Sequence, residues 1–334
     1  MAGPTIYDVA REAGVAPSTV SRTFSNPGRV RQSTRAHVVE VARKIGYRPN
    51  PRARSMLPGG TYAIGMVVSD ITNPHYSELI RGAEFRARAS EYTLVLLNAE
   101  ESPRIEYDQI RRLARSVDGF VLAASRLPDE NILEFASMRP LVLMNRELPG
   151  IPSVITDYVE GCRQIIEHLS SLGHESVLYL AGPRNSWTAT RRWTSLQAAA
   201  DEVGMQTRRV GSFTPTVANG GVAADAALRD GATAVVAHND LLAIGVLRRL
   251  ARRGVSVPGE VSIVGFDNIF AAELCTPTLT TLGGAHAMVG RAAVELLLGR
   301  TRAAVDAPDE PPHLIVPSEL QLRASTGPVR PSSL

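Results

Sequence analysis

The chain has 334 residues, of which 44% are hydrophobic and 21% charged, a composition typical of a globular protein with two or three packed domains. No run of 18 apolar residues occurs, and the first residues contain no basic segment followed by an apolar one, so we expect neither a signal peptide nor a membrane helix. The two cysteines lack zinc-ligand or CxxC spacing, and we expect a soluble, cytoplasmic protein with no disulfide framework, metal or cofactor.

Basic residues are concentrated near the N-terminus. Residues 1–60 contain ten Lys and Arg residues against three acidic residues, a net charge of +7, whereas the remaining 26 basic and 30 acidic residues sum to −4. A basic segment attached to a mildly acidic remainder indicates contact with a polyanion such as nucleic acid. A charged surface that only faces solvent is the alternative.

Residues 5–46 are predicted to form three short helices. The first starts with a cap-like Thr5-x-x-Asp8, carries apolar residues at helical spacing and ends at Gly14. The second begins at Pro17, and the third is capped by Ser33, with apolar residues that complete a small core. Two helices joined by a tight glycine turn have the form of a helix-turn-helix.

The second of these helices has the composition of a DNA-reading element. Ser18, Thr19, Ser21 and Arg22 lie on its polar faces, while Val20 points inward. Arginine can bond guanine O6 and N7, and Ser and Thr hydroxyls reach phosphates or bases. A helical hairpin that contacts another protein is the alternative, but the net charge of the segment favours DNA.

The segment YRPNPRARSMLPGG, residues 47–60, has the composition of a linker, because three prolines and two adjacent glycines interrupt it. The residues between the prolines are mostly helix formers, but they are too few to hold a helix alone in water. We therefore expect a helix here only when another molecule stabilises it.

Residues 61–326 alternate short apolar runs with amphipathic stretches, which predicts parallel α/β sheets with helices on both faces. Helices are expected near 77–90, 107–115 and 241–253, and the length favours two lobes. The predicted runs are YAIGMVVS, TLVLLN, FVLAAS, LVLMN, VLYLAG, RRVGSF, AVVAH and VSIVGF.

Polar and aromatic residues follow many of these runs, where parallel sheets place their ligands. Carboxylate, amide and guanidinium groups suit hydroxyl groups, and aromatic faces suit a sugar ring or, alternatively, a nucleobase. Each residue alone could be an ordinary turn residue, but their recurrence favours a sugar or polyol site. The candidates are His75, Tyr76, Asn145, Trp187, Arg191, Phe213, Asn239 and Asp267.

Catalysis finds no support in the sequence. It lacks GxSxG, HExxH, GxxxxGK[ST] and Rossmann GxGxxG motifs, and its single lysine, Lys44, lies outside the α/β region. We predict that the protein is not an enzyme. Two rivals to a ligand-responsive regulator are a solute-binding protein, which would not need the basic segment, and a ligand-independent architectural DNA-binding protein.

The stretch TIYDVAREAGVAPSTVSRTFSNPGRVRQSTRAHVVEVARKIGYRPNPRARSM resembles the headpiece and hinge of the LacI/GalR (lac-repressor) family of bacterial transcription regulators. The resemblance implies that Pro17, Ser18 and Arg22 lie against major-groove base edges. It implies a hinge helix that forms on operator DNA, with Met56 wedged into the minor groove and Ala53 allowing close approach. The residues implied to hold phosphates are Thr5, Tyr7, Thr19, Ser21, Asn26, Tyr47 and Asn50.

The stretches IGMVVSDITNPHYSELIRG, HNDLLAIGVLRRLARRGVSVPGEVSIVGFDN and TPTLTTL resemble the effector-binding core of the same family, which is similar to periplasmic sugar-binding proteins. By this resemblance Arg191, Asn239 and Asp267 bind ligand polar groups. His75, Tyr76, Phe213 and Trp187 line the pocket or stack on the ligand.

The predicted organisation is a small all-α helix-turn-helix headpiece followed by a two-lobed α/β core with doubly wound parallel sheets. The boundaries are 1–48 for the headpiece, 49–61 for the hinge, 62–326 for the core and 327–334 for a tail without leucine heptads. A helix-turn-helix usually reads half of a two-fold site, so we expect a homodimer on a pseudo-palindromic operator. The predicted function is a transcriptional repressor controlled by a small molecule, most simply a sugar or polyol, with a purine corepressor as the alternative.

Overall fold

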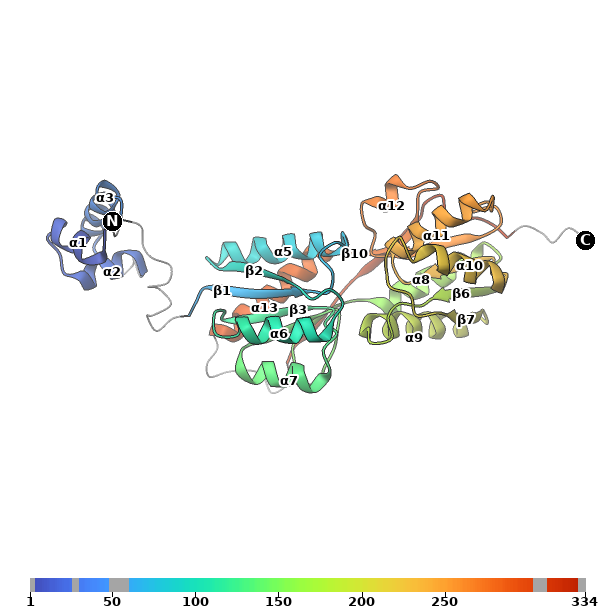
Figure 1. The fold of residues 1–334 in the computed structure, drawn as a ribbon, viewed down its shortest axis with the longest axis horizontal. Helices are drawn as coiled ribbons and strands as arrows, with labels where there is room; N and C mark the ends of the chain where they lie inside the picture. The colour runs from blue at the N-terminus through green and yellow to red at the C-terminus, as the bar shows by residue number, and fades with distance from the viewer. Residues whose placement is uncertain (1–3, 26–29, 48–59, 303–310, 330–334) are drawn as a thin grey trace, which may run out of the picture. The chain divides into compact units, whose positions relative to one another are not determined.

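The computed structural model describes residues 4–25, 30–47, 60–302 and 311–329. The chain divides into two units, residues 1–62 and 63–334. Helices make up the described secondary structure of the first unit, and two α/β lobes make up the second (Figure 1).

The first unit contains α1 (Ile6–Glu12), α2 (Pro17–Ser25) and α3 (Gln32–Lys44). The predicted start of α1 is confirmed, because Thr5 and Asp8 form a capping box. The predicted cap at Ser33 is wrong, because α3 starts at Gln32 and Ser33 already lies in its first turn. The buried core of this unit consists of Val9, Ala10, Ala13, Val20, Val38, Val41 and Ala42.

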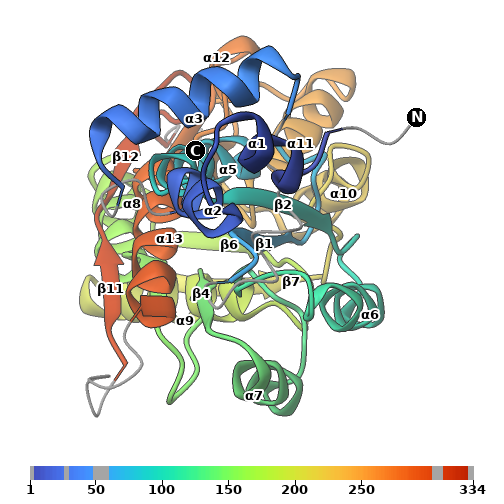
Figure 2. The same cartoon turned by 90° about the vertical axis from the view of Figure 1, so that its left-hand side faces the viewer.

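Lobe 1 of the second unit contains a six-stranded sheet in the order β11-β5-β4-β3-β1-β2, in which every pair is parallel. Helices α5 and α13 cover one face, and α6 and α7 lie together on the other, away from α13 in the end view of Figure 2. The strands are β1 (Ala63–Val68), β2 (Thr93–Asn98), β3 (Gly119–Ala123), β4 (Leu141–Met144), β5 (Ser153–Thr156) and β11 (His313–Val316). The helices are α5 (His75–Ala89), α6 (Pro103–Leu113), α7 (Asp129–Met138) and α13 (His286–Arg302).

Lobe 2 contains a second sheet in the order β12-β10-β9-β8-β6-β7, parallel except for the antiparallel β10–β12 pair. Helices α8 and α9 pack on one face, and α10, α11 and α12 pack on the other. The strands are β6 (Ser176–Leu180), β7 (Gln206–Val210), β8 (Ala234–Ala237), β9 (Ser262–Phe266), β10 (Thr280–Gly284) and β12 (Ser318–Gln321). The helices are α8 (Tyr158–Ser171), α9 (Trp187–Glu202), α10 (Gly220–Asp230), α11 (Asp240–Arg252) and α12 (Ala271–Leu274). The predicted two-lobed α/β core is thus confirmed.

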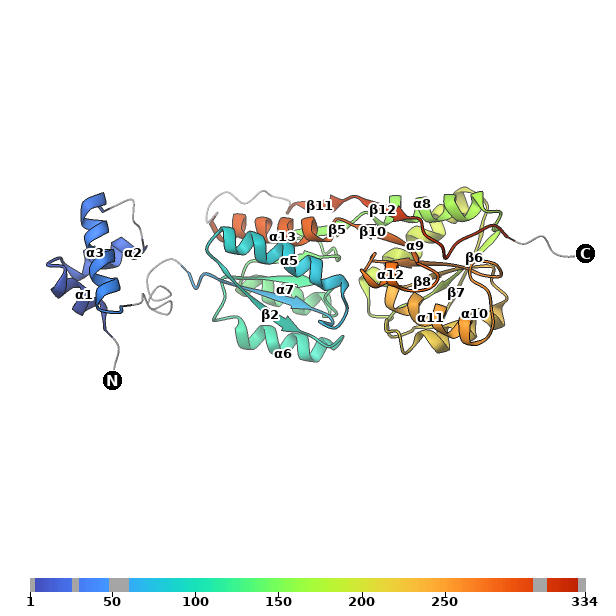
Figure 3. The ribbon, with the colours of Figure 1, turned by 90° about the horizontal axis from the view of Figure 1, so that it is seen from above.

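In the described chain, three segments cross between the lobes: one after β5, one after β10 and one between β11 and β12. Two of them touch, since the Asp157 N–H donates to the Val316 carbonyl at 2.9 Å and the Ser318 hydroxyl donates to the Asp157 carbonyl at 2.7 Å. The β5, β10, β11 and β12 segments lie along one side of the two lobes in Figure 3. The opposite side of the cleft is therefore free of chain crossings among the described residues.

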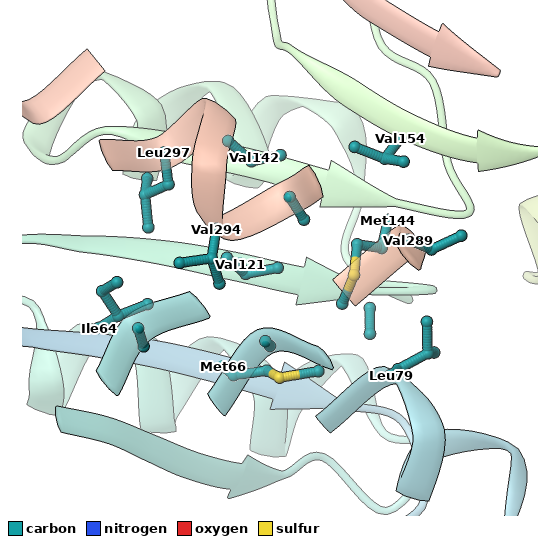
Figure 4. Packing of buried hydrophobic residues seen from close by; sticks show 14 of the residues in the cluster. Ile64, Met66, Leu79, Val121, Val142, Met144, Val154, Val289, Val294 and Leu297 are labelled. Atoms are coloured by element: carbon teal, nitrogen blue, oxygen red, sulfur yellow. The ribbon is translucent and has the colours of Figure 1, made fainter. Parts of the chain in front are cut away.

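Helices α5 and α13 pack unusually closely over the lobe 1 sheet. A Cβ added at Gly82 would lie 1.9 Å from the Ala287 carbonyl oxygen, and one added at Gly290 would lie 2.0 Å from the Leu79 carbonyl oxygen. Only glycine permits such an approach of two backbones. Beneath this contact, apolar side chains of both helices meet those of β1, β3, β4 and β5, as Figure 4 shows for Leu79, Val289, Met66 and Met144.

Candidate functional site

A cavity of ≈ 40 Å³ lies between the two lobes, at the carboxyl ends of several parallel strands. This is the edge where doubly wound sheets place their ligands. The lining residues come from both lobes: Asn73, His75, Tyr76, Glu101, Ala124, Arg126, Asn145, Tyr158, Ser186, Thr188, Arg192, Pro215, His238, Asn239 and Asp267.

Four lining residues adopt the left-handed backbone conformation that favours glycine. They are Glu101 (φ 57°), Ala124 (φ 53°), Asn145 (φ 52°) and Asp267 (φ 101°), and each follows the end of a strand. Such conformations cost on the order of 1–3 kcal/mol each and cluster at binding sites. The ends of β2, β3, β4 and β9 are therefore turned sharply to bring these residues to one cavity.

Arg192 on α9 is the most constrained cation of the cavity. Its guanidinium donates to Asp267 Oδ1 at 2.6 Å, to the His238 carbonyl at 2.5 Å and to the Tyr158 hydroxyl at 3.3 Å. It also lies over the Phe266 ring, 4.5 Å from the ring centroid. Because its side chain is 5% exposed, this ion pair is screened little by solvent.

Asp267 of lobe 2 contacts residues of lobe 1. It follows β9 in lobe 2, and His75 Nδ1 of lobe 1 lies 3.7 Å from its Oδ1. His286, the first residue of α13, bonds the Asp267 carbonyl through Nε2 at 2.7 Å. Burial alone would raise the pKa of Asp267, but His75, Arg192 and His286 together hold that pKa below its ordinary value.

His75 is neutral at pH 7. Burial lowers its pKa to about 3, although Asp267 acts in the opposite direction. Its Nδ1 is buried without a hydrogen-bond partner among the described residues, and its ring meets that of His286 edge to face at 4.5 Å. A buried, unpaired imidazole nitrogen beside a cavity is free to bond a ligand hydroxyl.

A second ion pair lies on the lobe 1 side of the cavity. Arg126 Nε donates to Glu101 Oε2 at 2.6 Å, and Arg126 is buried. With the Arg192–Asp267 pair, the lining contains two guanidinium groups and two carboxylates, so its formal charges cancel. Across the cleft, the Thr188 hydroxyl donates to the Asn145 carbonyl at 3.1 Å and connects α9 to the end of β4.

Five of the eight predicted ligand-binding residues line the cavity, and three do not. His75, Tyr76, Asn145, Asn239 and Asp267 are brought together. Arg191 is replaced by its neighbour Arg192, because successive residues on a helix point about 100° apart and only one of them can face the cleft. Helix α9 thus contributes Arg192 to the lining, one residue after the predicted Arg191.

Trp187 and Phe213 also lie outside the lining. Trp187 is the half-buried first residue of α9, whereas Phe213 packs against the apolar core on the α10–α11 side of the lobe 2 sheet. Arg126 was not predicted, although it directly follows the FVLAAS strand, where polar residues were expected to form the site. His238, the last residue of the AVVAH run, could have been found in the same way, whereas Glu101, Tyr158, Ser186 and Thr188 do not directly follow a predicted run.

The helix-turn-helix presents the expected polar face. Pro17, Ser18 and Arg22 on α2 are exposed, Thr19 and Ser21 are half-buried, and Val20 points into the core. Thr5 is exposed with its hydroxyl bonded to Asp8, and Tyr7 is 70% exposed. Tyr47 is half-buried, with its ring 5.9 Å from that of Phe24. The predicted contacts of Asn26, Asn50, Ala53 and Met56, and the hinge helix itself, lie outside the described residues.

Two family models match the chain. Residues 5–50 match the model of bacterial regulatory proteins of the lacI family, and residues 61–316 match that of periplasmic binding proteins and the sugar binding domain of the LacI family. The chain belongs to the LacI family. It is a DNA-binding transcriptional repressor regulated by an effector, and not an enzyme.

The curated relatives of this LacI-family chain include transcriptional repressors. The repressor CytR of Escherichia coli (strain K12) is 33% identical over 302 residues, which cover 88% of this chain and 89% of CytR. The ribose operon repressor of Bacillus subtilis (strain 168) is also 33% identical, over 88% of this chain and 91% of that protein.

Solved structures share the fold. A lac repressor dimer bound to operator and an anti-inducer aligns with a TM-score of 0.85 at 24% identity, over 98% of this chain and 100% of that one. A LacI family regulator from Enterococcus faecium with bound ribose aligns with a TM-score of 0.71 at 30% identity, over 80% of this chain and 100% of that one.

Two further properties follow from the described ranges alone. No helix in them is long and apolar enough to cross a membrane. No group of three His, Cys, Asp or Glu side chains in them is arranged to hold a metal ion.

Proposed function

We propose that this LacI-family repressor binds a pseudo-palindromic operator as a homodimer and releases it when an uncharged sugar or polyol enters the cavity between the lobes. The proposed ligand contacts are His75, Tyr76, Asn145, Asn239 and Asp267, with Arg192 in place of Arg191. The proposed DNA contacts in the described headpiece are Thr5, Tyr7, Pro17, Ser18, Thr19, Ser21, Arg22 and Tyr47.

The paired charges of the cavity support an uncharged ligand. Arg192 and Arg126 are already bonded to Asp267 and Glu101, so neither guanidinium is free to neutralise a ligand phosphate or carboxylate. A ligand with many hydroxyl groups can donate to the carboxylates and accept from the arginines without disturbing either pair. An anionic ligand would leave an uncompensated charge in a buried site, which is costly.

The size of the cavity suggests how binding is coupled to movement. Its ≈ 40 Å³ is far below the roughly 300–1,000 Å³ of sites that hold drug-sized ligands. A sugar therefore enters only if the lobes or the lining side chains separate. Because the lobes are linked along one side, the natural movement is an opening of the free side of the cleft.

A calorimetric titration tests the ligand class. D-ribose, cellobiose, hypoxanthine and ribose 5-phosphate are titrated into the full chain, and operator release is followed in parallel. We expect binding by at least one neutral sugar and none by the phosphate. Tight binding of ribose 5-phosphate would overturn the charge argument, and binding of hypoxanthine alone would favour the purine alternative.

Exposed apolar residues support a dimer. Phe85, Met288, Phe270 and Leu274 are 49%, 55%, 69% and 75% exposed, and exposed apolar side chains that form a contiguous patch mark interaction surfaces. Phe85, Met288 and Phe270 border one continuous surface. Arg291 lies over the Phe85 ring and lines a groove with Met288 and Glu78, and Glu78 also lines a groove with Phe270. Leu274 ends α12, the short helix that follows Phe270. A second copy of the chain is the proposed cover.

Sedimentation of the wild type and of Phe270→Asp tests this dimer. We expect the wild type to sediment as a dimer and the variant to dissociate at micromolar concentration. Exposed Leu133 on α7, outside this surface, provides the control Leu133→Asp, which should remain dimeric. A monomeric wild type would contradict the proposal.

Selection of the full chain on random duplex DNA at physiological salt tests the operator. Enrichment of a pseudo-palindrome is expected, and Arg22→Ala should relax the preference at one position in each half-site. Absence of any enriched sequence would favour either an architectural role or a repressor that needs a corepressor, and repeating the selection with a metabolite mixture would separate these two.

A further inference from the structure

The turn that carries Asp267 is held by three consecutive backbone N–H groups. The Asp267 N–H donates to the Leu282 carbonyl at 2.8 Å, the Asn268 N–H to the Thr281 hydroxyl at 3.2 Å and the Ile269 N–H to Asp240 Oδ2 at 2.9 Å. Asp267 and Asn268 both have positive φ, 101° and 48°. Two such residues in succession persist only where the surroundings hold them.

Asp240 lies at the centre of this arrangement. Its carboxyl group is fully buried, and its Oδ1 accepts the Thr281 hydroxyl at 2.6 Å, so the same hydroxyl accepts from Asn268 and donates to Asp240. Gly265 leaves space for this carboxyl group, because a Cβ at that position would lie only 2.1 Å from Asp240 Oδ1. Asp240, Thr281 and Gly265 thus form one fitted unit beneath the turn.

The position of Asp240 in α11 does not by itself explain a buried carboxyl group. An acidic residue in the first turn of a helix commonly bonds free N–H groups there. In α11 that role belongs to Asn239, whose Oδ1 accepts the Leu242 N–H at 3.0 Å. Both Asp240 oxygens instead bond residues beyond β9 and in β10.

Burial makes this carboxyl group costly to keep. Burial and the nearby Asp267 both raise the pKa of Asp240 well above its ordinary value. A hydroxyl or amide could satisfy the same N–H at a lower cost. Asp240 directly follows Asn239, which lines the cavity, and its side chain bonds the turn that follows Asp267, which also lines the cavity. The Asp240 side chain thus connects two segments of the lining.

We propose that Asp240 is a positioning residue for effector recognition: together with Thr281 it fixes the turn after β9, so that Asp267 is held against Arg192 and His75. The inference rests on the proposed ligand site, because it concerns the same cavity. Asp240 itself does not line the cavity.

Hydrogen–deuterium exchange of the full chain tests the positioning without any ligand. In Asp240→Ala and in Thr281→Val, amide exchange in the peptide containing Asn268 and Ile269 should accelerate on the order of tenfold. Asp240→Asn should lie between these variants and the wild type, because its amide oxygen can still accept from Ile269. Unchanged exchange in both Asp240→Ala and Thr281→Val would overturn the inference, and the milder Thr281→Val decides it if Asp240→Ala does not fold.

Ser262→Ala provides the matched control. Ser262 is equally buried at the other end of β9, and its hydroxyl donates to the Gly327 carbonyl at 3.1 Å. It contacts neither the turn nor the cavity. We expect Ser262→Ala to lower the melting temperature while leaving the exchange near Asn268 unchanged.

Titration with D-ribose and with cellobiose then distinguishes a loss of ligand affinity from a general loss of folding stability. Asp240→Ala and Thr281→Val should weaken the binding of whichever sugar the wild type takes on the order of tenfold, whereas Ser262→Ala should not. Equal affinities in all variants would overturn the positioning role. If the wild type takes neither sugar, the proposed ligand fails for those two compounds, while the exchange experiment still decides the role of Asp240.

Discussion

At the scale of single residues, the two neighbouring arginines of α9 provide a direct comparison. Arg192 is buried and bonded to Asp267, whereas Arg191 is half-buried with no ion pair among the described residues. Removing one partner of a buried ion pair costs about 3–5 kcal/mol, while most surface changes cost about 0.5 kcal/mol or less. We expect urea unfolding to show a large loss of stability for Arg192→Ala and a small one for Arg191→Ala. Similar losses for the two variants would contradict the position of Arg192.

His75 should make folding stability depend on pH. Its pKa is about 3 in the folded chain, against 6.5 for an ordinary histidine. Between these two pH values, His75 is therefore protonated in the unfolded chain and neutral in the folded chain. Stability is fully present above pH 6.5 and is lost as the pH falls. From pH 7 to 5 the loss from this residue is about 2 kcal/mol.

Urea unfolding at pH 7 and pH 5 measures this dependence in the wild type and in His75→Gln. The variant should lose less stability between the two pH values. Some dependence should remain, because burial also lowers the pKa of His238 well below its ordinary value. An identical loss in wild type and variant would show that the pKa of His75 is not lowered in the folded protein.

At the scale of elements, the α5–α13 contact depends on glycine. An added methyl group at Gly290 would collide with the α5 backbone at Leu79, so Gly290→Ala should cost about 1–3 kcal/mol of folding stability. Gly299 on the same helix has open space around it, and Gly299→Ala should stabilise by about 0.5–1 kcal/mol through its better helix propensity. Thermal unfolding of the two variants should therefore shift in opposite directions. An unchanged or raised melting temperature for Gly290→Ala would mean that the two helices can separate at little cost.

At the scale of the whole molecule, local patterns were enough for the architecture but not for the inside of the cavity. The spacing of apolar residues in neighbouring positions is enough to predict strands and helices. The expectation that ligands bind at the carboxyl ends of parallel strands then predicted Asn145, Asn239 and Asp267, which line the cavity. Arg192 was missed because the facing side of α9 depends on how that helix packs on the sheet. Asp240 also follows a predicted strand, but its contact with Thr281 could not be predicted, since Thr281 lies 41 residues away in the chain.

In the proposed repressor, sugar binding and operator binding are coupled, and thermodynamic linkage requires each ligand to change the affinity for the other by the same factor. If a sugar weakens operator binding by some factor, the operator must weaken sugar binding by the same factor, typically about 5–150-fold. Titrating the sugar with and without operator duplex gives one factor, and titrating the duplex with and without saturating sugar gives the other. A scrambled duplex of equal length should leave the sugar affinity unchanged. Equal factors above one would establish that the cavity controls DNA binding, whereas factors of one would leave a sugar-binding protein whose headpiece does not respond.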